Sequence, residues 1–355
     1  SYVEVTAPIG LHVEYGAVEV HDDGTASLFV GTSTHGQGHH TAFAMLVSDQ
    51  TGIPVPDVRV LDGDTATVPK GGGTGGSRSL QLGGSAVHQA TETMVERARA
   101  LAAHLLEADV SDVVVDTERG TVGVAGVPAS ALSWGELAAR ADEAPNDLLP
   151  DGVLGAAGDF DQGDATFPFG THIAVVEVDL DTGHVRLVRH VAVDDCGRVL
   201  NPLLVEGQQH GGVAAGAGQA LLEEVRYDDA GNPMTSTLAD YGIATAAELP
   251  LFEVHSTETP TPLNPLGAKG IGEAATIGAT PAVQNAVIDA VAHLGVRHID
   301  MPCTAERVWR TIRHAEAGTL PDPWRDPPAI FATLAAAAHA ATATEGDGVS
   351  ATESI

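Results

Sequence analysis

Apolar and polar residues alternate along two stretches of the chain, as expected for strands with one buried face. The first stretch covers residues 13–30, turns at Asp23-Gly24 and changes phase near Gly16, which indicates a β-bulge. The second covers residues 173–193 and turns at Asp181-Thr182-Gly183. Each stretch therefore predicts a β-hairpin.

Apolar residues at helical spacing follow the hairpins. They predict helices that end at Gly52, cover residues 85–107 and 132–140, begin near Leu203, and cover residues 305–314. Thr280-Pro281 has the form of an N-cap followed by proline at the first helical position, so a further helix is expected from there to Gly295. Short strands are expected at 58–61, within 110–126 and at 250–258.

Hairpin, glycine-rich loop and helix occur in this order in both parts of the chain, although no convincing sequence repeat accompanies them. The predicted fold class is α+β, built from two similar α/β sub-units. The first half is expected over residues 1–140 and the second over 170–320. A crossover linker rich in Asp, Pro and Gly would cover 141–169, and a peripheral tail 321–355.

The composition restricts the possible partners. The 355 residues carry a net charge of -31, with Lys70 and Lys269 as the only lysines. Such acidity argues against nucleic-acid binding, and it fits a salt-rich habitat as well as a biased genome composition. No apolar run reaches the ~18 residues that cross a bilayer. Cys196 and Cys303 form neither a metal-binding nor a disulfide pattern, so a reducing, cytoplasmic location is expected.

Two glycine-rich loops are candidates for function. The stretch Asn264–Glu273 has three glycines in six residues and ends in a carboxylate, which we interpret as a catalytic base on a loop that approaches something closely. The loop Gly71–Ser79 lacks the Lys-Ser/Thr ending of a P-loop. Its backbone N–H groups suit an anionic cofactor, and a tight surface turn is an equally good interpretation.

Several polar residues have two interpretations each. Gln37 and Gln208 suit the edge of a heterocycle or an oxo group, or are satisfied loop residues. Arg78 and Lys269 are anion contacts or structural cations. Cys196 is interpreted as a small buried residue.

Two apparent motifs are set aside. His35, His39 and His40 are better explained as loop residues than as metal ligands, because no acidic residue accompanies them as in a metalloprotease. The spacing from Gly270 to Ala275 fits a dinucleotide fingerprint, but no strand precedes it, so chance explains the match.

Four motifs occur in order along the chain: His35-Gly36-Gln37-Gly38-His39, Gly73 to Ser79, Asp195 to Pro202 with Gly207-Gln208-x-x-Gly211-Gly212, and Gly267-x-Lys269-Gly270-x-Gly272-Glu273. They resemble the molybdenum hydroxylases of the xanthine oxidase family, and most of all the large subunit of the aerobic carbon monoxide dehydrogenases. Individually each motif is weak, but together and at family spacing they are specific, and the likeness extends from Ser1 to about Ile312.

The resemblance implies the fold of the molybdopterin-binding domain of xanthine oxidase and aldehyde oxidoreductase. It also implies a molybdopterin cytosine dinucleotide cofactor whose molybdenum is held by the pterin dithiolene and by no protein ligand. The residues implied in cofactor binding are Gly36, Gln37, Gly38, Gly76, Ser77, Arg78, Ser79, Gln208, Lys269 and Gly270.

The implied reaction is hydroxylation of an electron-poor carbon, in an aldehyde or N-heterocycle, or oxidation of a small substrate. Water supplies the oxygen and Glu273 is the base. Electrons would leave through 2Fe-2S clusters in a small subunit to FAD in a medium subunit. A non-catalytic scaffold or assembly subunit is the alternative. The substrate, the electron acceptor and the oligomeric state do not follow from the residues.

Family large subunits are much longer, and this chain matches their C-terminal, second molybdopterin domain. A separate chain carrying the first domain is therefore an expected partner. Because the chain starts at Ser1 without Met, we expect either a split subunit or a cleaved fragment. The cysteine-bearing active-site loop of the carbon monoxide enzymes has no equivalent here, so carbon monoxide is not supported as the substrate.

Overall fold

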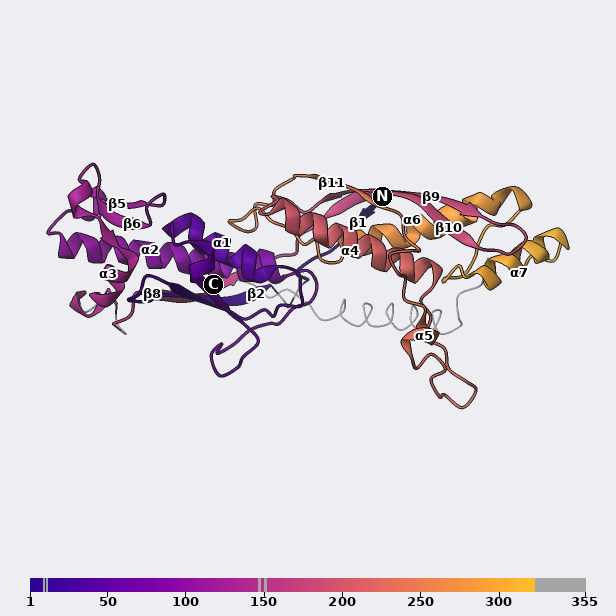
Figure 1. Ribbon diagram of the computed structural model, residues 1–355, viewed down its shortest axis with the longest axis horizontal. Helices are drawn as coiled ribbons and strands as arrows, with labels where there is room; N and C mark the ends of the chain where they lie inside the picture. Colours follow the sequence, from indigo (N-terminus) through magenta and orange to yellow (C-terminus); the bar gives the residue numbers. More distant parts are fainter. Residues whose placement is uncertain (9, 11, 146–147, 150–151, 323–355) are drawn as a thin grey trace, which may run out of the picture.

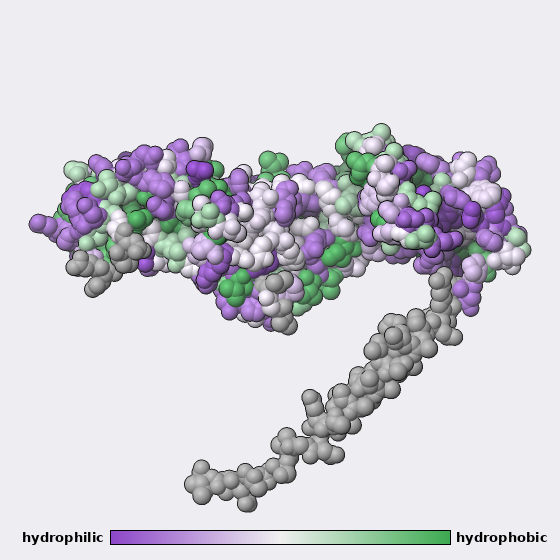
Figure 2. All heavy atoms as spheres, turned by 90° about the horizontal axis from the view of Figure 1, so that it is seen from below, coloured by the Kyte–Doolittle hydropathy of each residue, from purple (hydrophilic) through white to green (hydrophobic). Residues whose placement is uncertain are grey.

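The computed structural model describes residues 1–8, 10, 12–145, 148–149 and 152–322. The body is elongated, and two halves built on separate four-stranded sheets lie end to end (Figure 1). Hydrophilic residues spread over both ends of the body on the face shown in Figure 2, in keeping with the strong net charge. None of the helices within the described residues is long and apolar enough to cross a membrane.

The sheet of the first half has the strand order β4-β3-β2-β8. β2 (Val13–Val20) and β3 (Ala26–Val30) form the first expected hairpin, β4 (Val58–Leu61) runs parallel to β3, and β8 (Gly155–Asp161) is antiparallel to β2. Two helices pack against it, α1 (His39–Thr51) and α2 (Ser85–Leu105). A π-helical segment, Ser79–Gly84, leads into α2.

The sheet of the second half has the order β11-β10-β9-β1. β9 (Phe169–Val178) and β10 (Val185–Asp195) form the second expected hairpin, β11 (Glu253–Thr257) runs parallel to β10, and β1 (Tyr2–Val3) is antiparallel to β9. The helices α4 (Pro202–Leu221) and α6 (Ala274–Val291) pack together on one face of this sheet.

The two halves repeat one arrangement, so the expectation of two similar α+β units is confirmed at the level of topology. In each, a hairpin leads through a loop to a helix, a strand parallel to the second hairpin strand, another loop and a second helix. The loop before α2 therefore corresponds to the loop before α6. These are the two glycine-rich loops that the sequence singled out.

The remaining elements are peripheral. A small sheet of β5 (Val113–Asp116), β6 (Thr121–Val124) and β7 (Leu132–Ser133) lies with α3 (Trp134–Ala139) at the end of the first half (Figure 1). α5 (Leu238–Tyr241) and α7 (Ala305–Glu316) belong to the second half. Short 3-10 turns are formed by Val55–Asp57, Val110–Asp112, Pro128–Ser130, Ala141–Glu143 and Ala292–Leu294.

The expected bulge at Gly16 is wrong. β2 pairs in continuous register with β8 from Val13 to Glu19 and with β3 from Gly16 to Val20. The glycine is required by packing instead, because a Cβ on Gly16 would lie 2.6 Å from the carbonyl carbon of Ala86 on α2.

The expected start of α6 at Pro281 is also wrong. The helix begins at Ala274, directly after Glu273, and Pro281 lies inside it on an exposed face. Close packing on α4 explains why the helix continues through the proline. Cβ atoms on Gly212 and Gly216 would lie 2.7 Å from Ala275 Cβ and 2.8 Å from Ala279 Cβ respectively, so the two backbones touch through small residues.

The halves share strands in a way that the expected boundaries did not include. β8 lies within 141–169, which was expected to be a crossover, and it completes the first sheet. β1 lies at the start of the expected first half, yet it pairs with β9 of the second. Most of the expected tail, residues 323–355, lies outside the described residues.

Candidate active site between the two halves

A cavity of about 560 Å³ lies where loops of both halves meet. Its walls come from the loop before α1, the loop before α2, the first turns of α4 and the loop before α6. Of the residues that the sequence assigned to catalysis or cofactor binding, all except Gly38 and Arg78 line it: Gly36, Gln37, Gly76, Ser77, Ser79, Gln208, Lys269, Gly270 and Glu273. Segments distant in the sequence therefore form one site.

The two glycine-rich loops touch at Ser77. A Cβ on Gly270 would lie 2.7 Å from Thr6 Cγ2 and closer still to Ser77 Cβ, and one on Gly272 would lie 3.0 Å from Ser77 Oγ. Ser77 itself has a positive φ of 52°, which is uncommon for a residue with a side chain. The two loops can approach each other this closely only because Gly270 and Gly272 carry no side chain.

Gly38 has a similar role at the other side of the cavity. It ends the loop before α1 with a φ of 81°, and a Cβ there would lie 2.5 Å from Leu204 Cδ2 on α4. The loop of the first half therefore rests on a helix of the second. Gly38 shapes the cavity without lining it.

Arg78 is a structural cation within the glycine-rich loop. Its guanidinium is buried, lies 2.8 Å from Glu14 Oε2 on β2, and donates to the carbonyls of Gly73 and Val13. The Gly72 N–H donates to the same Glu14 carboxylate. Glu14 was not singled out from the sequence, yet with Arg78 it fastens the loop to the first sheet.

Lys269 is held by a carboxylate in the same manner. Its Nζ lies 3.0 Å from Asp195 Oδ1 and 4.7 Å from the centre of the Phe169 ring. Burial raises the pKa of Asp195, but hydrogen bonds from Gly197, Thr259 and Lys269 and the lysine charge outweigh it, so the net pKa is lowered. Lys269 thus lines the cavity while Asp195 balances its charge.

The cavity has features that fit an anionic, phosphate-bearing cofactor. The N-termini of α1, of the π-helical segment and of α6 all begin at it without a side-chain cap or an acidic residue in the first turn. Their free backbone N–H groups favour negative charge. Ser77 Oγ is buried and has no hydrogen-bond partner among the described residues. The residues present thus fit the pterin dinucleotide that the motifs imply.

Glutamine side chains line the cavity from both halves. Gln37 accepts from the His35 N–H, and Gln208 lines the cavity from α4. The neighbouring Gln209, which the sequence did not single out, is buried and donates to Asp194 Oδ2 and to the carbonyl of His255. It belongs to the core of the second half and holds α4 against the sheet.

The histidine and cysteine side chains at the cavity include His39 and Cys196. No group of three or more His, Cys, Asp or Glu side chains able to hold a metal ion occurs among the described residues. His39 stacks on Phe43, and burial lowers its pKa to about 4, so it is neutral at pH 7. Cys196 is buried, which raises its pKa to about 12 and makes it a poor nucleophile.

Glu273 stands at the N-terminus of α6 with its side chain exposed at the cavity. A helix N-terminus attracts negative charge nearby. A second acid, Glu4, lies against it: burial, the charge of Glu273 and a hydrogen bond to Glu273 raise the pKa of Glu4 to about 8. The sequence did not single out Glu4, because it sits in a short edge segment without a motif.

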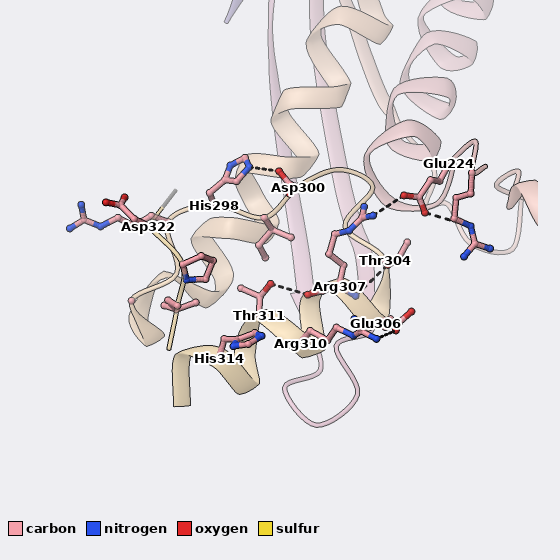
Figure 3. Close-up of a pocket in the computed structure, with 16 residues that line it drawn as sticks. Glu224, His298, Asp300, Thr304, Glu306, Arg307, Arg310, Thr311, His314 and Asp322 are labelled. Atoms are coloured by element: carbon pink, nitrogen blue, oxygen red, sulfur yellow. Dashed lines mark hydrogen bonds and ion pairs between the residues drawn. The ribbon is translucent and has the colours of Figure 1, made fainter. Parts of the chain in front are cut away.

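A larger hollow of about 820 Å³ lies at the other end of the second half, around α7 (Figure 3). Its charged side chains pair with one another: Arg307 with Glu224 at 2.7 Å, and Arg310 with Glu306 at 2.6 Å. None of the residues that the sequence assigned to catalysis or cofactor binding lines it. Size alone therefore does not mark the functional cavity.

Comparison with known proteins identifies the family. Residues 2–250 match the molybdopterin cofactor-binding domain family. The carbon monoxide dehydrogenase large chain of Hydrogenophaga pseudoflava is 39% identical over 83% of this chain and 36% of its own length. The nicotine 6-hydroxylase large subunit of Paenarthrobacter nicotinovorans is 34% identical over 86% of this chain and 38% of its own length.

A solved structure agrees with these relatives. The carbon monoxide dehydrogenase of Oligotropha carboxidovorans superposes with a TM-score of 0.79 at 35% identity, over 89% of this chain and 40% of that one. The expected α+β molybdopterin-binding fold is thus confirmed. The chain spans little more than a third of the length of the curated relatives that it matches. It belongs to the molybdopterin cofactor-binding domain family and is similar to a part of the carbon monoxide dehydrogenase large chains.

Proposed function

We propose that this chain is the molybdopterin-binding part of a molybdenum hydroxylase and that Glu273 is its catalytic base. The observation that carries the proposal is the position of Glu273: an exposed carboxylate at a helix N-terminus, on the wall of a cavity whose other walls offer uncapped N–H groups. The bound molybdenum group would supply the two-electron oxidation.

The residues of the chain divide the remaining tasks. The loops at Gly36-Gln37 and Gly76–Ser79, with Gln208, Lys269 and Gly270, hold the cytosine dinucleotide form of the cofactor through N–H groups and side-chain amides. Arg78 and Gly38 keep these loops in place from behind the cavity wall. Glu273 accepts a proton at its carboxylate from the water-derived oxygen that is transferred to the substrate.

An electron-poor carbon in an aldehyde or N-heterocycle is the proposed substrate class. The nicotine hydroxylase among the relatives supports the heterocycle by its name. Carbon monoxide is not proposed, because no residue of the described chain corresponds to the active-site cysteine loop of that enzyme type. Cys196, which lines the cavity, has a raised pKa.

The chain is proposed to act with partners in the cytoplasm: a chain with the first molybdopterin domain, a 2Fe-2S subunit and an FAD subunit. An uncovered apolar sheet face supports the first of these. α4 and α6 cover one face of the second sheet, whereas Val3, Phe169, Ile173 and Val175 lie 41–66% exposed on the opposite face. This chain matches only about a third of the length of its relatives, and the part that it does not match is proposed to cover this sheet face.

Glu273→Gln in the complete complex tests the catalytic role. The expected result is unchanged molybdenum and pterin content with turnover lowered by at least about a thousandfold, because only the proton acceptor is lost. Glu306→Gln is the matched control, since it replaces an exposed carboxylate in the first turn of α7, and it should keep wild-type turnover. Near-normal turnover of Glu273→Gln would reject the base.

Metal analysis of the purified complex tests the alternative, a non-catalytic scaffold subunit. The proposal expects molybdenum, iron and flavin to co-purify with the chain. A complex with all its subunits present but without molybdenum would favour the scaffold.

A further inference from the structure

Glu4 is a buried acid without a cation. It follows β1 in an extended segment whose backbone is fixed by Glu4 N–H to Pro168 O at 2.9 Å and Thr6 N–H to Thr166 O at 2.9 Å. The residue is only 6% exposed, and its Oε2 has no hydrogen-bond partner among the described residues. Buried carboxylates are rare unless a cation or several donors compensate them. Such an isolated acid needs an explanation.

The groups that act on Glu4 are themselves acidic. The loop before α6, which carries Glu273, touches the segment of Glu4, because a Cβ on Gly270 would lie 2.7 Å from Thr6 Cγ2. Besides burial, the charge of Glu273, a hydrogen bond with it and the charge of Asp194 on β10 raise the pKa of Glu4. Tyr2 on β1 is also close, but its hydroxyl is bound to Asp194 at 2.6 Å. His172 likewise bonds to Asp194, at 3.0 Å.

A cation in the loop before α6 is already paired with another acid. Lys269 in the same loop is paired with Asp195 at 3.0 Å. Apart from burial, the causes that raise the pKa of Glu4 are Glu273 and Asp194, both of them acids. The two facing carboxyls therefore share one proton, which is taken up from solvent.

We propose that Glu4 is a positioning residue for Glu273: as a neutral acid it donates a hydrogen bond to the Glu273 carboxylate and holds it at the cavity. This inference rests on the base role proposed above. Two carboxyls in contact cannot both be charged at low cost, and the proton stays on the one that is harder to solvate. Glu4 is buried and Glu273 is exposed at a helix N-terminus, so Glu4 keeps the proton.

The arrangement gives the site an alkaline limit. Near pH 8 Glu4 loses its proton, because its pKa is raised to about that value by burial and by Glu273. The hydrogen bond then disappears and the two carboxylates repel each other. Turnover should fall above this pH through misplacement of Glu273.

Infrared spectroscopy of the complete complex, with 13C-labelled glutamate, tests the protonation directly. The wild type should show the carbonyl stretch of one neutral glutamic acid at pH 7, titrating near pH 8, and Glu4→Gln should lack it. In Glu273→Gln the same band should titrate at lower pH, since the neighbouring charge is gone. Identical spectra for the wild type and Glu4→Gln would overturn the inference.

Kinetics of two substitutions separate positioning from folding. Glu4→Gln keeps a donor of similar size, so kcat at pH 7 should fall less than about threefold and the alkaline limb should vanish. Glu4→Ala should lower kcat about 10- to 100-fold with little change in KM, because Glu4 does not contact the substrate. Molybdenum content of both variants checks that the cofactor is loaded.

The outcomes also distinguish this inference from the function on which it rests. If Glu273→Gln loses turnover while Glu4→Ala keeps wild-type kcat at all pH values, positioning by Glu4 is rejected and the base stands. If Glu273→Gln keeps turnover, the base is rejected, and the infrared band alone then reports whether Glu4 holds the shared proton. Should Glu4→Ala fail to assemble, the pH profile of Glu4→Gln decides.

Discussion

Gly270 and Ser77 meet so closely that neither loop could keep its path if Gly270 carried a side chain. They come from equivalent positions of the two halves, the loops before α6 and before α2. The contact brings the helix that starts after Glu273 against the loop whose N–H groups line the cavity. The site thus depends on a contact between halves as much as on the chemistry of each loop.

Gly270→Ala should loosen this contact. We expect a destabilisation of about 1–3 kcal/mol and a partial loss of bound molybdenum, because the added methyl overlaps Thr6 and Ser77. Urea denaturation and metal analysis of the complex measure both effects. Gly158→Ala is the control: it is exposed on β8 with nothing within 4 Å of a Cβ, and it should change stability by less than about 0.5 kcal/mol.

Arg78→Met should destabilise the first half by about 3–5 kcal/mol, because it leaves the buried Glu14 carboxylate without its cation. The fluorescence of Trp134, buried in the core of that half, reports the unfolding. Adding Glu14→Leu removes the stranded charge and should restore most of the loss. If Arg78 served the cofactor alone, Arg78→Met would lower cofactor content without changing the stability of the cofactor-free chain.

Pro281→Ala should stabilise the protein. The proline lies exposed inside α6 and removes one helical N–H, at a cost of about 3 kcal/mol in a helix interior. The proline also restricts the unfolded chain, which stabilises the folded protein by only about 0.4–1 kcal/mol. A net gain of about 2 kcal/mol is expected in urea denaturation, and a lower midpoint would show that the proline itself packs favourably.

His190 should make stability depend on pH. Burial, followed by the neighbouring His172, lowers its pKa to about 4, whereas an unfolded histidine titrates near 6.5. Between these values the unfolded chain binds the extra proton, so this contribution is complete above about pH 6.5 and is lost as the pH falls toward 4. The pKa of Glu4 is raised to about 8, so its contribution to stability is complete below about pH 4.3 and is lost as the pH rises toward 8.

His190→Leu isolates the histidine term. The slope of unfolding free energy against pH near pH 5 should fall by about 1.4 kcal/mol per pH unit, the value for one proton. The absolute stability of the variant is not the test, since the cavity is repacked. Parallel slopes for the variant and the wild type would contradict a neutral, buried His190.

Ile173→Glu should weaken association with the proposed partner domain. Ile173 is 58% exposed on the uncovered sheet face, and a charge there would have to be buried in the interface. Val110→Glu, at a 48% exposed position in the first half, is the matched control. Analytical ultracentrifugation of the complex measures the difference, and equal assembly of both variants would exclude this face.

Local pattern was enough to predict the hairpins and most helices, because each carries its own period and turn residues. β8 was missed, since the glycines and alanines of Gly155–Asp161 have little strand propensity and only the ladder to β2 makes them a strand. The helix start expected at Pro281 was wrong because packing of α6 on Gly212 and Gly216 outweighs the local sequence signal.

Motifs predicted the cavity wall but not what supports it. Gln37, Gln208 and Glu273 lie at the cavity as expected. Glu14 beneath Arg78 and Glu4 behind Glu273 could not be found, because a single acid in a strand has no signature until its partner is placed next to it. Such pairs depend on the fold as a whole.

The edge strand β1 has a consequence for handling this protein. β1 (Tyr2–Val3) pairs with β9 of the second sheet, whereas the next strand, β2, belongs to the first sheet. The N-terminal segment of the chain is therefore a structural part of the second half. Producing residues 170–320 alone would expose the edge of β9 and remove Glu4 from Glu273. Dissecting the protein therefore requires residues 1–6 to be supplied in trans or grafted after Asp322, so that the acid pair stays in one piece.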